Sequence, residues 1–528
     1  MANNSSTSSP YVFPPSQGFH GNDGLWSTFI MRIGSPAQNF HILPSTNGDN
    51  VVIPLIDGCA GDDGISATLC GSLRGAMPFN NRESTGFAVN SSTSWRNIGI
   101  FSLPLGQQWG IEGAAQYGYD TVGLAVQNSG GPTLEDQVVA GIAMKEFFLG
   151  VFPLGTKPTN FSTFENPQPS YLVSLKDHDI IPGLGFGYTA GAHYQYTGVT
   201  GSLVVGGYDA SRLDSNRTKT FTFGHDDNHS FMVGLQNIVA VNTLQGTVSP
   251  LTDGVVVSID STLPYLWLPG EVCDRFQAAF GLTYDEYSQM YLVNDTVHER
   301  LKQLNPRISL TLGDGTNSGT GSAVAIDLPY AAFDLQASWP IMENATNYFP
   351  LKRATNSTQY TLGRTFLQEA YLSADYERRV FNVSQATFAS PMPEQEIVPV
   401  EPITNATEAT AHSSPPSLSV PSKVGIGIGV AGAAILTLVV GLFCYKRRHG
   451  AQASPSTDIP CSPDALTVDA KEAASADIFE FHEDVRPNEA DSDGSQRYEL
   501  SSSQRPLELS PEGRVHEMMA ENKVHEMA

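Results

Sequence analysis

Two short segments far apart in the chain resemble each other but differ at the one residue that could act as an acid or a base. Ile42–Pro54 reads ILPSTNGDNVVIP and Ile259–Pro269 reads IDSTLPYLWLP, so each is an apolar strand, a polar turn and a second apolar strand. The second turn begins with Asp260, whereas the first has Ser45 there. A carboxylate exchanges protons near the working pH of a protein and a serine hydroxyl does not. Only one of the two loops therefore carries acid–base chemistry.

The residues around the first loop resemble a known family. Ile33–Pro54 is similar to the N-terminal strand and loop of pepsin-like aspartic peptidases, whose pattern is G-[TS]-P-x-Q-x-F-x-V-x-x-D-T-G-S. The residues that match this pattern without a gap are Gly34, Ser35, Pro36, Gln38 and Phe40. This register places Ser45 where the family has its first catalytic aspartate, and Asn47 where it has the glycine of D-T-G.

Further segments follow in the order that the resemblance requires. YGYDTVGL looks like the strand after the family's flap, FLGVFPLG like the segment that closes the first loop, and PSYLVSLKDHDII like the helix that follows. GSLVVGGYDASR resembles the end of the first lobe, and Tyr360–Phe388 resembles the C-terminal signature. The resemblance covers most of residues 20–388. It implies a mainly β, bilobal pepsin-like acid-protease fold with a central cleft.

In that family each loop contributes one aspartate to the floor of the cleft. Two carboxylates a few Å apart cannot both ionise easily, so they share a proton. One then acts as general base on a water while the other donates to the peptide carbonyl. This chain keeps Asp260 but has Ser45 in place of the first aspartate, and Thr262 replaces the second glycine. We therefore expect no peptidase activity, and Asn47 and Thr262 could hold the two loops apart.

Other residues leave alternatives open. Asp49 or Asp57 could replace the missing carboxylate only if the first loop changed its register, and Asp260 without a partner could be a hydrogen-bonded turn residue. The flap segment FSLPLGQQWGIEG offers Leu105–Gly106 or Trp109–Gly110 where the family has a tyrosine and a glycine.

Composition limits the classes of function. The chain has 528 residues, which predicts two or three globular units. Apolar residues make up 40% and charged residues 16%, a profile typical of a folded chain, and apolar runs broken by Gly, Pro, Asn and Asp favour β structure. The net charge of −25 argues against nucleic-acid binding, which needs a basic face. We expect no cofactor and no metal site.

Two cysteines enclose a short glycine-rich loop. Cys59 and Cys70 flank CAGDDGISATLC, and we expect a local disulfide between them, the alternative being two buried thiols. Cys273 has no obvious partner and is expected to be a buried thiol. The segments PSYLVSLKDH and GEVCDRFQAAFG are the best helix candidates in the folded body.

An uncharged apolar stretch predicts one membrane span. Val424–Tyr445 is long enough to cross a bilayer as a helix, and the basic KRRH at Lys446–His449 follows directly. The positive-inside rule then places the C-terminal tail in the cytoplasm and residues 1–423 outside or in a lumen, with the cell surface favoured over the vacuole. The start, MANNSSTSSPYVFPPSQ, lacks the regions of a signal peptide, so we expect a missing upstream signal rather than a reverse anchor.

Acceptor sequences for N-glycosylation all precede this span, which supports the same topology. Asn3 and Asn4 are followed by the sites expected to carry glycans: Asn90, Asn160, Asn216, Asn228, Asn294, Asn344, Asn356, Asn382 and Asn405.

The expected units are an N-terminal extension (1–20), an N-terminal lobe (21–210), a C-terminal lobe (211–390), a Pro/Ser/Thr-rich stalk (391–423), the membrane helix (424–445) and a disordered acidic tail (446–528). The favoured interpretation is a single-pass membrane glycoprotein with an inactive pepsin-like body. Its cleft would bind an extended peptide or protein ligand, so that it acts as a receptor, sensor or scaffold with an unknown cytoplasmic partner for the tail. The alternatives are an active membrane-anchored aspartic endopeptidase and a structural cell-surface protein.

Overall fold

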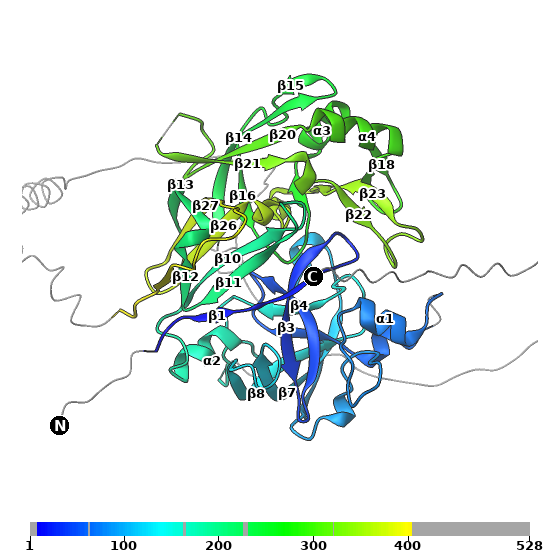
Figure 1. Ribbon diagram of the computed structural model, residues 1–528, viewed down its shortest axis with the longest axis vertical. Coiled ribbons are helices and arrows are strands. Elements are labelled where there is room, and N and C mark those ends of the chain that lie inside the picture. Colours follow the sequence, from blue (N-terminus) through cyan, green and yellow to red (C-terminus); the bar gives the residue numbers. More distant parts are fainter. Residues whose placement is uncertain (1–7, 62–63, 162–164, 225–230, 320, 404–528) are drawn as a thin grey trace, which may run out of the picture. The chain divides into compact units, whose positions relative to one another are not determined.

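The computed structural model describes residues 8–61, 64–161, 165–224, 231–319 and 321–403 (Figure 1). All of them belong to one compact unit, Met1–Ser417. Within these ranges the chain forms five sheets and four α-helices, so the predicted mainly β class is confirmed. None of the helices in the described ranges has the length and apolarity needed to span a bilayer, and the predicted span at 424–445 lies outside those ranges.

An eight-stranded sheet, called here the N-terminal sheet, is built from the first part of the chain. Its order is β2-β3-β4-β9-β5-β8-β7-β6, and β3 also pairs with β7, so part of the sheet closes on itself. Its strands are β2 (Pro15–His20), β3 (Trp26–Ile33), β4 (Gln38–Ser45), β5 (Val51–Pro54), β6 (Arg96–Ser102), β7 (Ala114–Leu124), β8 (Thr133–Ile142) and β9 (Gly150–Pro153).

A second eight-stranded sheet, the C-terminal sheet, has the order β21-β20-β14-β16-β25-β17-β24, with β15 beside β14. Its strands are β14 (Met232–Thr243), β15 (Gly246–Val248), β16 (Val255–Ile259), β17 (Leu266–Leu268), β20 (Arg307–Gly313), β21 (Ala323–Pro329), β24 (Leu351–Arg353) and β25 (Thr361–Leu362). A four-stranded sheet is built from the same part of the sequence and contains β18 (Thr283–Asp285), β19 (Met290–Leu292), β22 (Leu335–Ala337) and β23 (Thr346–Phe349).

A six-stranded sheet joins the two parts of the chain. In the order β1-β11-β10-β26-β27-β13, the first three strands come from before residue 210 and the last three from after it. The antiparallel pair β10–β26 forms the seam between them. The strands are β1 (Tyr11–Phe13), β10 (Gly185–Ala192), β11 (Val199–Val205), β13 (Leu213–Thr222), β26 (Ala370–Asp375) and β27 (Val380–Ala386).

The α-helices are short and lie between strands. They are α1 (Ala67–Leu73), α2 (Tyr171–Asp177), α3 (Gly270–Phe280) and α4 (Asp295–Leu304). Both predicted helices are present, as α2 and α3. The 3₁₀ helices are η1 (Ile56–Cys59), η2 (Val89–Ser91), η3 (Gln107–Trp109), η4 (Ala210–Arg212), η5 (Tyr330–Ala332), η6 (Ser357–Gln359) and η7 (Phe366–Gln368).

The strands around the two similar loops are arranged in the same way. In the N-terminal sheet, β9 lies between β4, which is parallel to it, and β5, which is antiparallel, and β5 also pairs with β8 in parallel. In the C-terminal sheet, β25 lies between parallel β16 and antiparallel β17, and β17 pairs with β24 in parallel. The first loop therefore leaves β4, passes the end of β9 and returns as β5 on the other side of β9. The second loop runs in the same way from β16 past β25 to β17.

Both ends of the folded body reach further than predicted. Residues 1–20 were expected to be an extension, but β1 pairs with β11 there and the Phe13 side chain is buried. The stalk was expected from residue 391, but β28 (Ile397–Pro399) pairs with β12 (Gly207–Asp209). Val400 then donates its N–H to the carbonyl of Gly206 at 2.9 Å. These pairings depend on distant partners, which local composition does not reveal.

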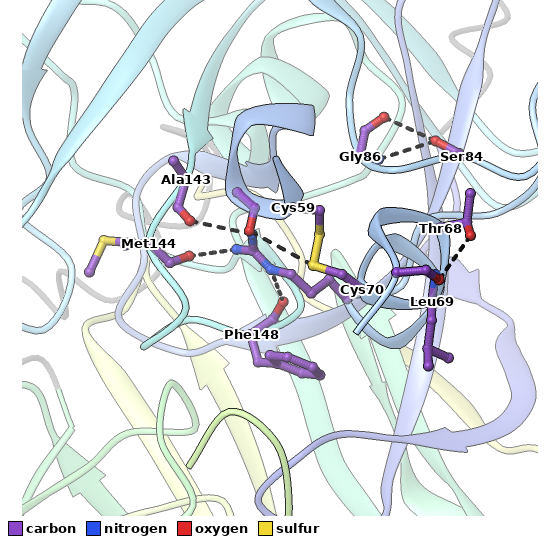
Figure 2. Close-up of a disulfide and its surroundings, with 12 residues drawn as sticks. Cys59, Thr68, Leu69, Cys70, Ser84, Gly86, Ala143, Met144 and Phe148 are labelled. Carbon is purple, nitrogen blue, oxygen red and sulfur yellow. Dashed lines mark hydrogen bonds between the residues drawn. A yellow bond between two sulfur atoms is a disulfide. The ribbon is translucent and has the colours of Figure 1, made fainter. Parts of the chain in front are cut away.

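A disulfide joins η1 to α1, as the sequence predicted (Figure 2). The Cα atoms of Cys59 and Cys70 are 5.6 Å apart. The buried guanidinium of Arg74, just after α1, donates to the carbonyls of Ala143, Met144 and Phe148. This region is thereby fixed to the segment that leads into β9. The thiol of Cys273 is buried and unpaired with another cysteine, also as predicted.

Candidate functional site

The two loops are in direct contact. Strand β4 ends at Ser45, and Asp260 follows the end of β16. The N–H of Thr46 donates to Ser261 Oγ at 3.0 Å, and the N–H of Ser261 donates to Thr46 Oγ1 at 3.0 Å. Ser261 Oγ also donates to the carbonyl of Pro44 at 2.7 Å. These reciprocal bonds hold the loops together, so Asn47 and Thr262 do not keep them apart.

Ser45 and Asp260 belong to one chain of hydrogen bonds. The hydroxyl of Thr262 donates to Asp260 Oδ1 at 2.6 Å, and its N–H donates to the same oxygen at 2.9 Å. Ser45 Oγ lies 2.6 Å from Thr262 Oγ1. Because the single hydroxyl proton of Thr262 goes to the carboxylate, Ser45 must be the donor to Thr262. Thr262, which replaces a glycine in the family pattern, is thus the link between the two predicted site residues.

This arrangement places one carboxylate where a pair would be needed for shared-proton chemistry. The side chains of Ser45 and Asp260 are 0% and 1% exposed, so the serine hydroxyl is not open to an incoming substrate. Its proton is also directed toward Thr262. The geometry is that of one buried, hydrogen-bonded carboxyl group without a second carboxyl opposite it.

Neither alternative acid replaces the missing aspartate. Asp49 Oδ1 accepts the N–H of Lys157 at 3.1 Å, and a Cβ on Gly155 would lie 2.3 Å from that oxygen, so Asp49 packs against the segment after β9. Burial raises the pKa of Asp49 to about 6. Asp57 is exposed in η1. The first loop keeps its predicted register, with Ser45 facing Thr262.

The segment between β6 and β7, predicted as the flap, lies against both loops. Gln108 Nε2 donates to Asp260 Oδ2 at 3.5 Å. Trp109 is 6% exposed, donates from Nε1 to Thr361 Oγ1 at 3.2 Å, and stacks on Trp267 with ring centroids 6.4 Å apart. Gly106 and Gly110 flank η3 at φ 88° and 78°, the left-handed region that favours glycine. Trp109, one of the two predicted tip positions, therefore packs on strands β17 and β25 of the C-terminal sheet.

A cavity of about 350 Å³ lies beside Asp260. The first loop, the flap segment and residues 155–157 form its walls, together with Phe223, Tyr376 and Arg379. Among the residues that the structure describes, the charged ones lining it are Asp49, Asp260, Lys157 and Arg379. A hollow of about 30 Å³ is lined by Ser45, Thr262 and Arg364, among others. In the described part of the chain, no group of three or more His, Cys, Asp or Glu side chains is placed to hold a metal ion.

The predicted glycosylation sites fall into three groups. Exposed side chains occur at Asn90, Asn160, Asn216, Asn294, Asn344 and Asn356. Asn382 lies within β27, where its Oδ1 accepts from Thr220 Oγ1 at 2.6 Å and its Nδ2 donates to Ser373 Oγ at 3.1 Å. Asn228 and Asn405 lie outside the described residues. The Asn382 amide is thus engaged on both sides.

Neither known protein families nor curated proteins match this chain. The resemblance to pepsin-like peptidases therefore rests on the motifs in the sequence, and the pepsin-like fold and the absence of peptidase activity stay predictions.

Sequence reasoning overlooked several residues of the site. The bonds between Thr46 and Ser261 had a visible signal, because both loops place a hydroxyl residue directly after Ser45 or Asp260. Nothing local marked Trp109 as a partner of Trp267, or Arg379 as part of the cavity. Those two contacts join segments that are far apart in the sequence.

Proposed function

We propose that this chain is an inactive pepsin-like protein that binds peptide without cleaving it. One observation carries the proposal: the position opposite Asp260 is held by Ser45, which donates through Thr262 to the carboxylate. Peptide hydrolysis by a carboxyl pair requires one group to accept a proton from water while the other gives one to the carbonyl. A hydroxyl that already donates its proton to Thr262 supplies neither function.

The size of the expected loss follows from the chemistry. One positioned general acid or base contributes about 10²–10⁴-fold to a rate, and here the remaining carboxylate also lacks the partner that would tune its proton affinity. The cavity beside Asp260 favours a binding role over a purely structural one, because it offers both apolar walls and charged groups to a ligand.

The proposed setting is a membrane surface. Exposed acceptor asparagines on the folded body are compatible with passage through a compartment where glycans are added. The predicted span at 424–445 would anchor the body, and the acidic tail would reach a cytoplasmic partner. Together these features suit a receptor, sensor or scaffold.

The test uses the full chain, because strands outside residues 20–390 belong to the fold. The purified protein is incubated with an unfolded protein substrate between pH 3 and pH 6, with and without pepstatin. We expect no pepstatin-sensitive cleavage. Cleavage that is abolished by pepstatin and by Asp260→Ala, but not by Asp57→Ala at an exposed acid away from the loops, would establish the active endopeptidase instead. If the protein also binds no member of a peptide library, the structural alternative is favoured.

A further inference from the structure

The flap segment already occupies part of the space above the two loops. Leu103 and Trp109 are buried in one apolar cluster with Val52 of the N-terminal sheet and Leu263 of the second loop. Trp109 is also held by Thr361 and Trp267, as described above. A strand-length peptide would have to displace these buried contacts before it could lie along the loops.

The space that remains is compact. Its volume of about 350 Å³ is near the lower end of the roughly 300–1,000 Å³ typical of small-ligand pockets. The same flap segment forms one wall through Leu103–Gln108, and the turn between β26 and β27 forms another through Arg379. The Nη2 of Arg379, which is exposed, donates to the carbonyl of Gly224 at 3.3 Å. These limits favour a ligand of a few residues.

The charges around the cavity are of both signs. A purely anionic ligand would meet the carboxylate of Asp49, since Asp260 is only 1% exposed, and a purely cationic one would meet Lys157 and Arg379. A ligand with one positive and one negative end can place each end beside the opposite charge. Charge-assisted hydrogen bonds of this kind are stronger than neutral ones, so the lining favours a dipolar ligand.

We infer that the cavity beside Asp260 takes a dipeptide or tripeptide with free termini, its ammonium group beside Asp49 and its carboxylate beside Arg379. The inference rests on the proposed peptide-binding function and narrows its ligand from an extended peptide to a short one. Asp49 and Arg379 are then the residues that set specificity for free chain ends.

The test compares ligand length and end groups on the full chain. Three pooled libraries are equilibrated with the protein: tripeptides with free termini, the same tripeptides acetylated and amidated, and blocked decapeptides. Retained peptides are measured by mass spectrometry, and affinities by calorimetry. The variants are Asp49→Asn, which keeps an oxygen to accept the Lys157 N–H, and Arg379→Ala. The matched control is Arg378→Ala in the same turn, where Arg378 pairs with Asp375 outside the cavity.

We expect free tripeptides to be retained by the native protein and by Arg378→Ala, with affinity reduced about tenfold or more in Asp49→Asn and Arg379→Ala. Retention of decapeptides but not tripeptides would overturn the inference and leave the proposed function standing. Equal retention of blocked and free tripeptides, or no effect of the two cavity variants while their unfolding midpoints stay native, would also overturn it. Retention of no library would remove the proposed function itself.

Discussion

A carboxylate at position 45 should destabilise the protein in a pH-dependent way. Ser45 Oγ and Asp260 Oδ1 are separated by two hydrogen bonds of 2.6 Å each through Thr262. In Ser45→Asp the two carboxylates would therefore lie about 5 Å apart. At an effective dielectric of about 20, the repulsion between two unit charges at that distance is roughly 3 kcal/mol.

The direction in which the stability of Ser45→Asp changes with pH follows from the proton that the two carboxyl groups share. Repulsion and burial raise the pKa of the new pair in the folded state above the value of about 3.9 that an aspartate has in the unfolded chain. The folded variant therefore binds a proton that the unfolded chain has released. Stability is retained at about pH 4 and is lost as the pH rises through the folded pKa. The penalty should be at least roughly 3 kcal/mol at pH 8, because burial of the new charge adds to the repulsion, and much smaller at pH 4.

The assay is urea unfolding of the native chain, Ser45→Asp and Ser45→Asn at both pH values. Asparagine has nearly the same size as aspartate but no charge, so the asparagine variant measures the steric cost of a larger side chain at position 45. Space there is limited by Gly48, because a Cβ added to Gly48 would lie only 2.8 Å from Ser45 Oγ. The difference between the aspartate and asparagine variants isolates the charge effect. If that difference is the same at pH 4 and pH 8, position 45 and Asp260 are not coupled, and the site described above is wrong.

Restoring the whole motif should restore some catalysis. Ser45→Asp together with Asn47→Gly and Thr262→Gly rebuilds two D-x-G loops and removes the hydroxyl that now bridges them. We expect weak peptidase activity with an acid optimum and pepstatin sensitivity, while Ser45→Asp alone should give little. A folded triple variant without activity would show that other parts of the cleft, the flap segment first, also prevent catalysis.

Three further predictions concern the body around the site. Burial raises the pKa of Glu369 to about 7, so its protonated form stabilises the folded state at low pH and this contribution is lost as the pH rises through that value. The Glu369 contribution to the unfolding free energy should fall by roughly 2–3 kcal/mol between pH 5 and pH 8, and the difference between the native chain and Glu369→Gln should change by that amount. Asn382→Gln should leave the mass of the glycoprotein unchanged, whereas Asn344→Gln should remove one glycan, as mass spectrometry would show, because the Asn344 side chain is exposed. Trp109→Ala should lower the unfolding free energy by about 3 kcal/mol in urea titrations, and Trp109→Phe by only about 1 kcal/mol, because phenylalanine keeps most of the packing but not the bond to Thr361.

Local sequence patterns predicted the elements that depend on local forces. The helix α2 begins after Ser170, whose Oγ accepts the N–H of Val173, and α3 ends at Gly281 in the left-handed conformation. The close spacing of Cys59 and Cys70 was enough to predict their disulfide. The helix α4 was missed although Asn294 caps it, because only Leu301 is buried along it and its apolar periodicity is weak.

Elements that depend on distant partners were not predicted. Strand β28 lies in a stretch rich in Pro and Glu that reads as a linker, and it becomes a strand only because β12 offers its edge. The same holds for β1 at the start of the described chain. The cavity combines the first loop with Phe223, Tyr376 and Arg379, so its charge pattern exists only after the sheets have assembled.

The hydrogen bonds between the loops explain how the site can keep its shape without a carboxyl pair. The exchange between Thr46 and Ser261 uses backbone N–H groups and hydroxyls, and neither Ser45 nor Asp260 takes part in it. Replacing one aspartate by serine therefore leaves the loop contact intact and removes a like-charge repulsion from a buried site. The serine then serves as a donor in a chain that ends on Asp260. This arrangement supports the proposal that the cavity binds a ligand without hydrolysing it.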